Sequence, residues 1–161
     1  MDNRPIGVFD SGLGGLTVVK ALKELLPNES IVYFGDTARL PYGVKSQGLV
    51  KQYSKEIIKF LLEKNAKAVI IACNTATAMA LNSLKNEFKN IPIIGVIDPG
   101  SEKAIFETAT QKIGVIGTIA TISSGAYEKE IKQKDSRIEI ISKACPLFVP
   151  FVEEGLIHGS A

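Results

Sequence analysis

The chain alternates between short apolar segments and longer stretches with helical periodicity. The apolar segments are nearly continuous and rich in β-branched residues, a pattern typical of strands that are covered on both faces and therefore of parallel sheets. The predicted strands are residues 6–10, 30–35, 67–72, 91–97, 112–118 and 137–142.

Two of the intervening stretches have the apolar stripe of a surface helix. In residues 46–65 the stripe comprises Leu49, Tyr53, Ile57, Phe60 and Leu61. In residues 16–28 it comprises Val18, Leu22, Leu25 and Leu26, and Pro27 ends the helix. Strands and helices that alternate at this spacing predict an α/β fold, in which an open parallel sheet has flanking helices and right-handed crossovers.

One segment is a candidate domain boundary. The sequence Asp-Pro-Gly-Ser at 98–101 reads as a turn, and it follows the fourth predicted strand. We therefore expect a first α/β domain at 1–97, which carries Asp10 and Cys73. Residues 98–161 are then the incomplete start of a second, similar α/β domain.

Composition and charge narrow the class of protein. The 161 residues are 45% hydrophobic, which is enough to bury a core, and 19 Lys and Arg against 17 Asp and Glu give a formal net charge of +2. This balance indicates no nucleic-acid partner. No apolar run approaches the ~20 residues that span a bilayer, so no membrane partner is expected. Two cysteines are too few for a disulfide scaffold or a structural zinc site, so we expect a cytoplasmic protein with reduced thiols and no metal.

Polar residues follow the ends of several predicted strands. The first strand ends in Asp10-Ser11 and the third in Cys73-Asn74-Thr75, each before a helix. Ligands of open α/β sheets bind at this edge. Helix capping explains several of these residues, but Asp10 and Cys73 are not both needed as caps. A lone cysteine near a strand is usually a core residue. A helix N-terminus, however, lowers the pKa of a thiol, so Cys73 is expected to be the reactive cysteine.

The remaining motifs give weaker indications of a function. Residues 10–17 are glycine-rich but complete neither GxGxxG nor a P-loop, so they indicate a small nest of backbone N–H groups for an anion. The Pro-Tyr-Gly turn within 39–46 lies at the edge where ligand loops belong. His158, the only histidine, is expected on the surface, and Cys145 is expected to be structural because its neighbours are apolar.

Five segments in order closely resemble the glutamate racemase family, within the aspartate/glutamate racemase superfamily. They are GVFDSGLGGLTV, GDTARLPYG, ACNTATA, GVIDPG and CPLFVPFVEEG. The resemblance implies an enzyme that interconverts L- and D-glutamate without a cofactor and supplies D-glutamate for bacterial peptidoglycan. Two cysteines act on opposite faces of the substrate α-carbon. The resemblance also leaves a homodimer open.

At the matching positions, the resemblance implies that Cys73 is the first catalytic cysteine and that Asp10 assists its proton handling. The implied glutamate-binding residues are Asp10, Ser11, Tyr42, Gly43, Asn74 and Thr75, with Thr118 and Glu153 near the pocket. A carboxylate beside a thiol should raise the thiol pKa. The helix N-terminus and the substrate ammonium would have to offset this effect.

The sequence departs from the family in one respect. The second catalytic cysteine of the family lies in a Gly-Cys-Thr-His segment that is absent here, and Cys145 matches a different position. We therefore expect the N-terminal part of a racemase that is inactive by itself. Two alternatives stay open. One is a related aspartate or hydantoin racemase, and the other is an inactive α/β module that binds a small dicarboxylate or a partner chain.

Overall fold

The structure is a computed structural model that describes residues 2–156 and 158–159. Its strands are β1 (Ile6–Asp10), β2 (Ile31–Gly35), β3 (Ala68–Ile71), β4 (Ile93–Gly95), β5 (Lys112–Gly117) and β6 (Glu139–Ala144). Its α-helices are α1 (Leu16–Leu25), α2 (Gln47–Glu63), α3 (Asn74–Glu87), α4 (Ile97–Glu107), α5 (Ile119–Ser123), α6 (Ala126–Lys134) and α7 (Phe148–Glu153). Two 3-10 turns, η1 (Thr37–Arg39) and η2 (Tyr42–Val44), precede α2.

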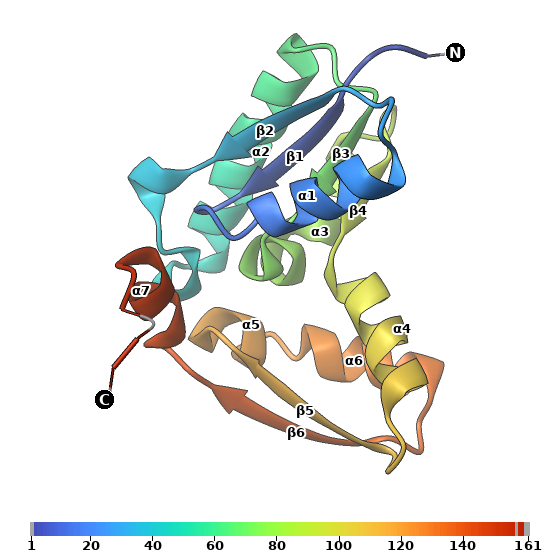
Figure 1. Ribbon diagram of the computed structural model, residues 1–161, viewed down its shortest axis with the longest axis vertical. Helices are drawn as coiled ribbons and strands as arrows, with labels where there is room; N and C mark the ends of the chain where they lie inside the picture. Colours follow the sequence, from blue (N-terminus) through green and yellow to red (C-terminus); the bar gives the residue numbers. More distant parts are fainter. Residues whose placement is uncertain (1, 157, 160–161) are drawn as a thin grey trace.

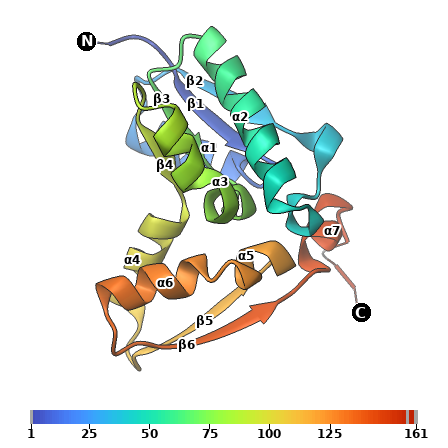
Figure 2. The ribbon, with the colours of Figure 1, turned by 180° about the vertical axis from the view of Figure 1, so that it is seen from behind.

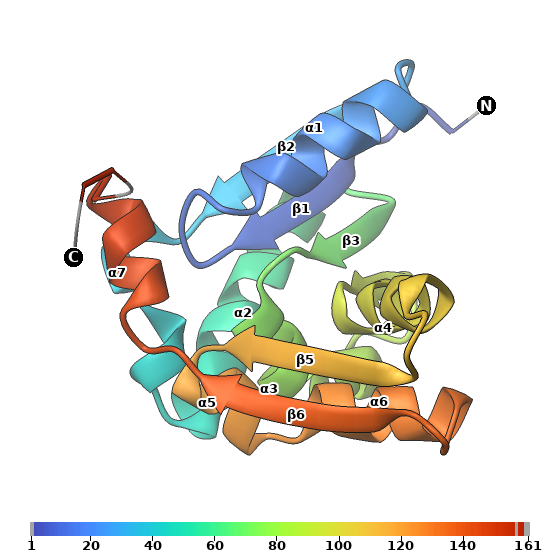
Figure 3. The same cartoon turned by 60° about the horizontal axis from the view of Figure 1, so that its bottom comes forward.

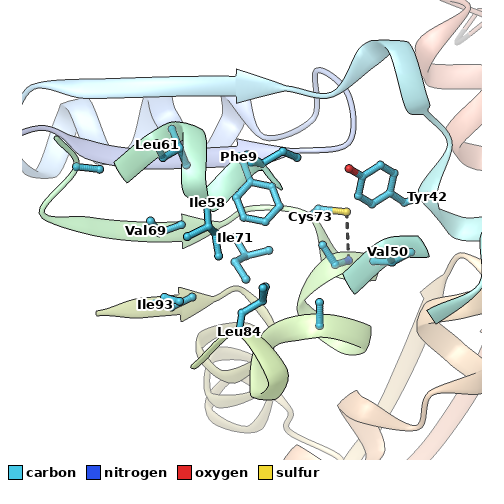
Figure 4. Close-up of a cluster of buried hydrophobic side chains, with 14 residues drawn as sticks. Phe9, Tyr42, Val50, Ile58, Leu61, Val69, Ile71, Cys73, Leu84 and Ile93 are labelled. Carbon is cyan, nitrogen blue, oxygen red and sulfur yellow. Dashed lines mark hydrogen bonds between the residues drawn. The ribbon is translucent and has the colours of Figure 1, made fainter. Parts of the chain in front are cut away.

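The first sheet has the order β2-β1-β3-β4, and every neighbouring pair is parallel. Helix α1 covers one face of this sheet, and α2 and α3 cover the other (Figures 1 and 2). The larger core lies under α2 and α3 (Figure 4) and includes Phe9, Ile58, Leu61, Val69, Ile71 and Leu84. The predicted α/β fold with a parallel sheet and flanking helices is therefore confirmed.

The helical stripes differ in detail from the prediction. In α2 the buried residues are Val50, Ser54, Ile57, Ile58 and Leu61. The buried face therefore includes Val50 and Ser54 but not Leu49, which is exposed. In α1, Val18 and Leu22 pack on the sheet, but Leu25 is 78% exposed and Leu26 is also exposed. The two leucines at the end of α1 therefore lie on the surface and do not join the core.

The predicted turn at 98–101 is wrong. Residues Asp98 to Ser101 lie in the first turns of α4, and the fourth strand ends at Gly95. Pro99 is compatible with the start of a helix because the first backbone N–H groups have no helical acceptor there. Residues 97 and 98 therefore join the two halves within a helix, and the domain boundary at 97/98 stays a prediction.

The second sheet contains β5 and β6, which are parallel neighbours. Ile113 and Val115 face α4 and α6 and pack with Ile131 and Ile138. The opposite face is exposed, so the expectation of strands covered on both faces is wrong here. The predicted strand at 137–142 also begins and ends two residues later.

The two halves meet through short elements. Helix α5 contacts α3 and η2 of the first half, and α7 follows β6 and lies beside the 3-10 segment (Figures 2 and 3). These contacts bring the ends of the strands in both sheets toward one region. Among the described residues, no helix combines the length and apolar character needed to cross a bilayer.

Candidate active site

A cavity of about 890 Å³ lies where the strand ends of the two halves meet. Every residue that the sequence predicted for the site lines it: Asp10, Ser11, Tyr42, Gly43, Cys73, Asn74 and Thr75. Thr118 and Glu153 line it as well. The cavity arises because parallel strands place their carboxyl ends at one edge. The structure therefore brings all the predicted site residues together.

Asp10 organises the loop between β1 and α1. It is the buried last residue of β1, and its Oδ2 accepts hydrogen bonds from the backbone N–H groups of Gly12 and Gly15, each at 3.1 Å. A Cβ atom at Gly15 would lie 2.6 Å from the Asp10 Cβ, so only glycine fits there. Both bonds go to Oδ2, and no described residue donates to Oδ1. A single carboxylate oxygen of Asp10 therefore holds the loop through two hydrogen bonds.

Cys73 is the N-cap residue of α3. Its buried Sγ accepts from the backbone N–H of Ala76 at 3.4 Å (Figure 4) and lies 3.6 Å from the Ser11 hydroxyl, to which the thiol donates. Cys73 thus caps α3, whereas Asp10 bonds to the loop that precedes α1, whose N-cap is Gly15 without a side-chain cap bond. This agrees with the expectation that Asp10 and Cys73 are not both needed for capping.

The pKa of Cys73 is raised, contrary to the sequence-based expectation. Burial is the largest cause, and the Asp10 carboxylate adds to it. The hydrogen bonds with Ala76 and Ser11 lower the pKa of Cys73, but by less than burial and Asp10 raise it. Since burial disfavours the charged form, Cys73 without a ligand is a neutral thiol near neutral pH.

The first two residues of α3 have different surroundings. The Asn74 side chain is exposed to the cavity, and its Oδ1 accepts from the Tyr127 hydroxyl at 2.6 Å. Thr75 is buried, and its Oγ1 lies 2.9 Å from that of Thr118 and 3.2 Å from that of Thr121. The backbone N–H groups of both residues belong to the first helical turn, which offers them no helical acceptor. These N–H groups are therefore suited to an anion.

Three threonine hydroxyls join the two halves. Thr118 and Thr121 lie 3.0 Å apart, so with Thr75 they form a closed cluster of hydroxyl groups. Thr118 is the N-cap of α5, which explains its spacing from Thr121. A Cβ atom at Gly43 would lie 2.5 Å from the Thr118 Cβ. The loop at Gly43 is therefore packed directly against the cluster.

Tyr42 is among the residues that line the cavity, and its phenol is held by a hydrogen-bond network. The hydroxyl donates to Asp36 Oδ2, the side chain is buried in the core, and Arg39 Nε donates to the same carboxylate at 2.7 Å. Burial and the Asp36 carboxylate raise the Tyr42 pKa. The buried network anchors residues 41–43. The Tyr42 hydroxyl is therefore already bonded to Asp36.

Several residues in or near the cavity were not predicted. Tyr33 donates its hydroxyl to the Gly12 carbonyl at 2.7 Å, and burial followed by the Asp10 charge raises its pKa to about 12. Glu153, which the resemblance implied to lie near the pocket, approaches the same glycine, since a Cβ at Gly12 would lie 2.2 Å from Glu153 Oε1. Tyr127 and Thr121 come from the second half. The three-residue spacing of Thr121 from Thr118, the N-cap of α5, could have pointed to Thr121, but no sequence pattern indicates Tyr127.

The remaining candidates lie as follows. Cys145 is partly exposed and lines the cavity, and its Sγ lies 3.8 Å from the Lys143 carbonyl. His158 is exposed, as expected. Within residues 2–156 and 158–159, no three His, Cys, Asp or Glu side chains are grouped as metal ligands would be.

The fold and the site define an α/β protein with a thiol at the strand ends. The model of the Asp/Glu/Hydantoin racemase family matches residues 6–146, and the chain belongs to this family.

Glutamate racemases are among its most similar relatives. The chain is 54% identical over 154 residues to the Aquifex aeolicus glutamate racemase, covering 96% of this chain and 59% of that protein. It is 56% identical over 153 residues to the Lactococcus lactis glutamate racemase, covering 95% of this chain and 56% of that protein. The crystal structure of the Francisella tularensis glutamate racemase in complex with D-glutamate matches with a TM-score of 0.92 and 48% identity. It covers 99% of this chain and 60% of that one. The chain thus spans less than two thirds of the length of these relatives.

Proposed function

We propose that this chain provides the glutamate-binding half and one acid–base thiol of a glutamate racemase. The observation that carries the proposal is the position of Cys73. Its Sγ lies beside Ser11 at the N-terminus of α3, in the cavity that also contains Asp10, Asn74 and Thr75. The similarity to glutamate racemases, one of them solved with D-glutamate, supports glutamate as the ligand.

The proposed chemistry is a proton transfer at the substrate α-carbon. The Cα–H bond breaks, its proton passes to the Cys73 thiolate, and its electron pair is stabilised by the adjacent α-carboxylate. The first N–H groups of α3, at Asn74 and Thr75, would bind that carboxylate and favour the developing charge. A second acid then returns a proton to the opposite face. We assign that acid to the part of the relatives that this chain does not match.

Formation of the Cys73 thiolate requires the substrate. The pKa of the thiol is raised by burial and by Asp10. A bound ammonium group would reverse part of this effect, because a nearby positive charge favours the thiolate and also neutralises the Asp10 charge. Asp10 would thereby assist the proton handling of Cys73. The proposal uses no cofactor.

The proposal also includes the cellular role that the resemblance implies. The whole protein would act in the cytoplasm and supply D-glutamate for peptidoglycan, and its assembly as a homodimer stays open. The family model spans aspartate and hydantoin racemases too, so these substrates are the main alternatives. The segments DSGLGG and PYG favour glutamate.

Incubation of the chain with each glutamate enantiomer in D2O tests the proposal. Only one thiol acts, so the α-hydrogen of one enantiomer should exchange slowly without inversion, as followed by NMR and circular dichroism. Cys73→Ser should abolish the exchange, whereas Cys145→Ser should preserve it. Parallel incubations with aspartate and hydantoins decide the substrate. Sustained inversion would show that another residue of this chain is the second acid. Binding of glutamate without any exchange would favour a binding module.

A further inference from the structure

We propose that Tyr127 is a positioning residue for the ligand, because its hydroxyl fixes which end of the Asn74 side-chain amide faces the cavity. This inference rests on the proposed function and deepens it. It concerns a residue of the second half that acts through a residue of the first.

The contact between the two side chains is short and spans the two halves. The Tyr127 hydroxyl on α6 donates to Asn74 Oδ1 at 2.6 Å, and 53 positions separate the two residues in sequence. A side-chain amide has one oxygen acceptor and an NH2 group with two donors. When Tyr127 occupies Oδ1, the Nδ2 group is the end left for a ligand.

Tyr127 is well held in this position. Its ring packs against the second core, which includes Ile113 and Ile131, and burial raises its pKa. The hydroxyl therefore stays protonated near neutral pH and can serve as the donor. A Cβ atom at Gly100 would lie 3.6 Å from the Tyr127 hydroxyl oxygen, so α4 lies next to this hydroxyl. The packing of the ring therefore holds the Tyr127 hydroxyl in place as a hydrogen-bond donor.

The orientation matters because the ligand is an anion. Asn74 is the first residue of α3, and its side chain is exposed to the cavity. With Nδ2 facing the cavity, the amide adds donors to the N–H groups of the helix N-terminus. A rotated amide would instead present an oxygen to a carboxylate, which is repulsive. Tyr127 would thereby favour carboxylate binding without touching the ligand.

A double-mutant cycle on glutamate binding tests this role. In Tyr127→Phe the ring is kept, and the dissociation constant for glutamate should rise about two- to tenfold, the range that one net hydrogen bond corresponds to. Asn74→Ala should weaken binding at least as much, and Tyr127→Phe/Asn74→Ala should be no weaker than Asn74→Ala alone. Tyr53→Phe is the matched control, since no described residue bonds to the Tyr53 hydroxyl, and it should bind as the unaltered chain does. An unchanged constant in Tyr127→Phe, or additive losses in the double variant, would overturn the proposal.

A measurement without ligand separates this proposal from the proposed function. A hydrogen bond to Oδ1 strengthens the amide C–N bond, so exchange between the two Asn74 Nδ2 protons, followed by NMR, should be slower in the unaltered chain than in Tyr127→Phe. Tyr53→Phe should leave this exchange rate unchanged. If the unaltered chain binds no glutamate, the proposed function fails, and this rate alone decides the Tyr127 contact. Equal rates in the unaltered chain and in Tyr127→Phe would refute it.

Discussion

The four-stranded sheet and the two-stranded sheet are both parallel, yet helices cover both faces of only the first. All five residues of β1 are buried, whereas exposed and buried residues alternate along β5. Ile116 and Ile141 are each 63% exposed on the open face. Both strands have apolar sequences, so the same pattern accompanies different surroundings. An apolar run therefore indicates a strand, but neighbouring elements decide which of its faces are covered.

The two halves also contribute differently to the site. The first half supplies Asp10, Ser11, Cys73 and the N-terminus of α3, which are the groups proposed to act on a ligand. The second half supplies contacts that hold these groups, through the threonine cluster and Tyr127. The chemistry is thus concentrated in the half with the fully covered sheet, where a larger core surrounds the strand ends.

The largest difference between the halves should appear when large side chains are truncated. Leu61→Ala in the first core removes a side chain with no exposed surface and should lower the free energy of unfolding by ~2–5 kcal/mol. Ile141→Ala on the open face of β6 should change it by less than about 0.5 kcal/mol. Urea denaturation measures both. A cost for Ile141→Ala that approaches that of Leu61→Ala would show that the second sheet is covered in solution.

A smaller effect is expected where the halves meet. Thr75→Val keeps the shape of the side chain but removes one hydroxyl from the threonine cluster. It should lower the free energy of unfolding by about 0.5–1.5 kcal/mol, the net contribution of a neutral hydrogen bond. The control is Thr110→Val, an exposed position with no side-chain hydrogen bond to a described residue. If both variants unfold alike, the cluster does not stabilise the contact between the halves.

Removal of the negative charge beside Cys73 should have the smallest effect on the fold. Asp10→Asn can still accept the N–H groups of Gly12 and Gly15, but it removes the negative charge that helps to raise the Cys73 pKa. The thiolate forms as pH rises through that pKa. The alkylation rate of Cys73 by iodoacetamide should therefore increase at a lower pH in Asp10→Asn.

The two cysteines provide an internal comparison for the same experiment. Near neutral pH and without ligand, the buried Cys73 should react more slowly than the partly exposed Cys145. Mass spectrometry of the labelled peptides gives both rates. A pH profile for Cys73 that is identical in Asp10→Asn would show that burial alone sets its pKa.

The sequence by itself determined the strands and most of their limits, because alternating apolar segments and helical stripes are local properties. It also determined that polar side chains follow β1 and β3, and parallel topology then requires them to share one edge. Asp10, Ser11, Cys73, Asn74 and Thr75 could be predicted as a site for this reason. The motifs that contain them also indicated the family, because each motif is a continuous run of residues.

Only the tertiary structure decided how these side chains are used. The thiol of Cys73 has a raised pKa because the fold buries it beside Asp10, whereas the local pattern showed only a helix N-terminus. The phenol of Tyr42 is buried and donates to Asp36, whereas the local pattern showed only a turn. The bonds from Thr75 to Thr118 and from Asn74 to Tyr127 join residues 43 and 53 positions apart. Periodicity does not specify such contacts, because they depend on how the two halves of the chain pack together.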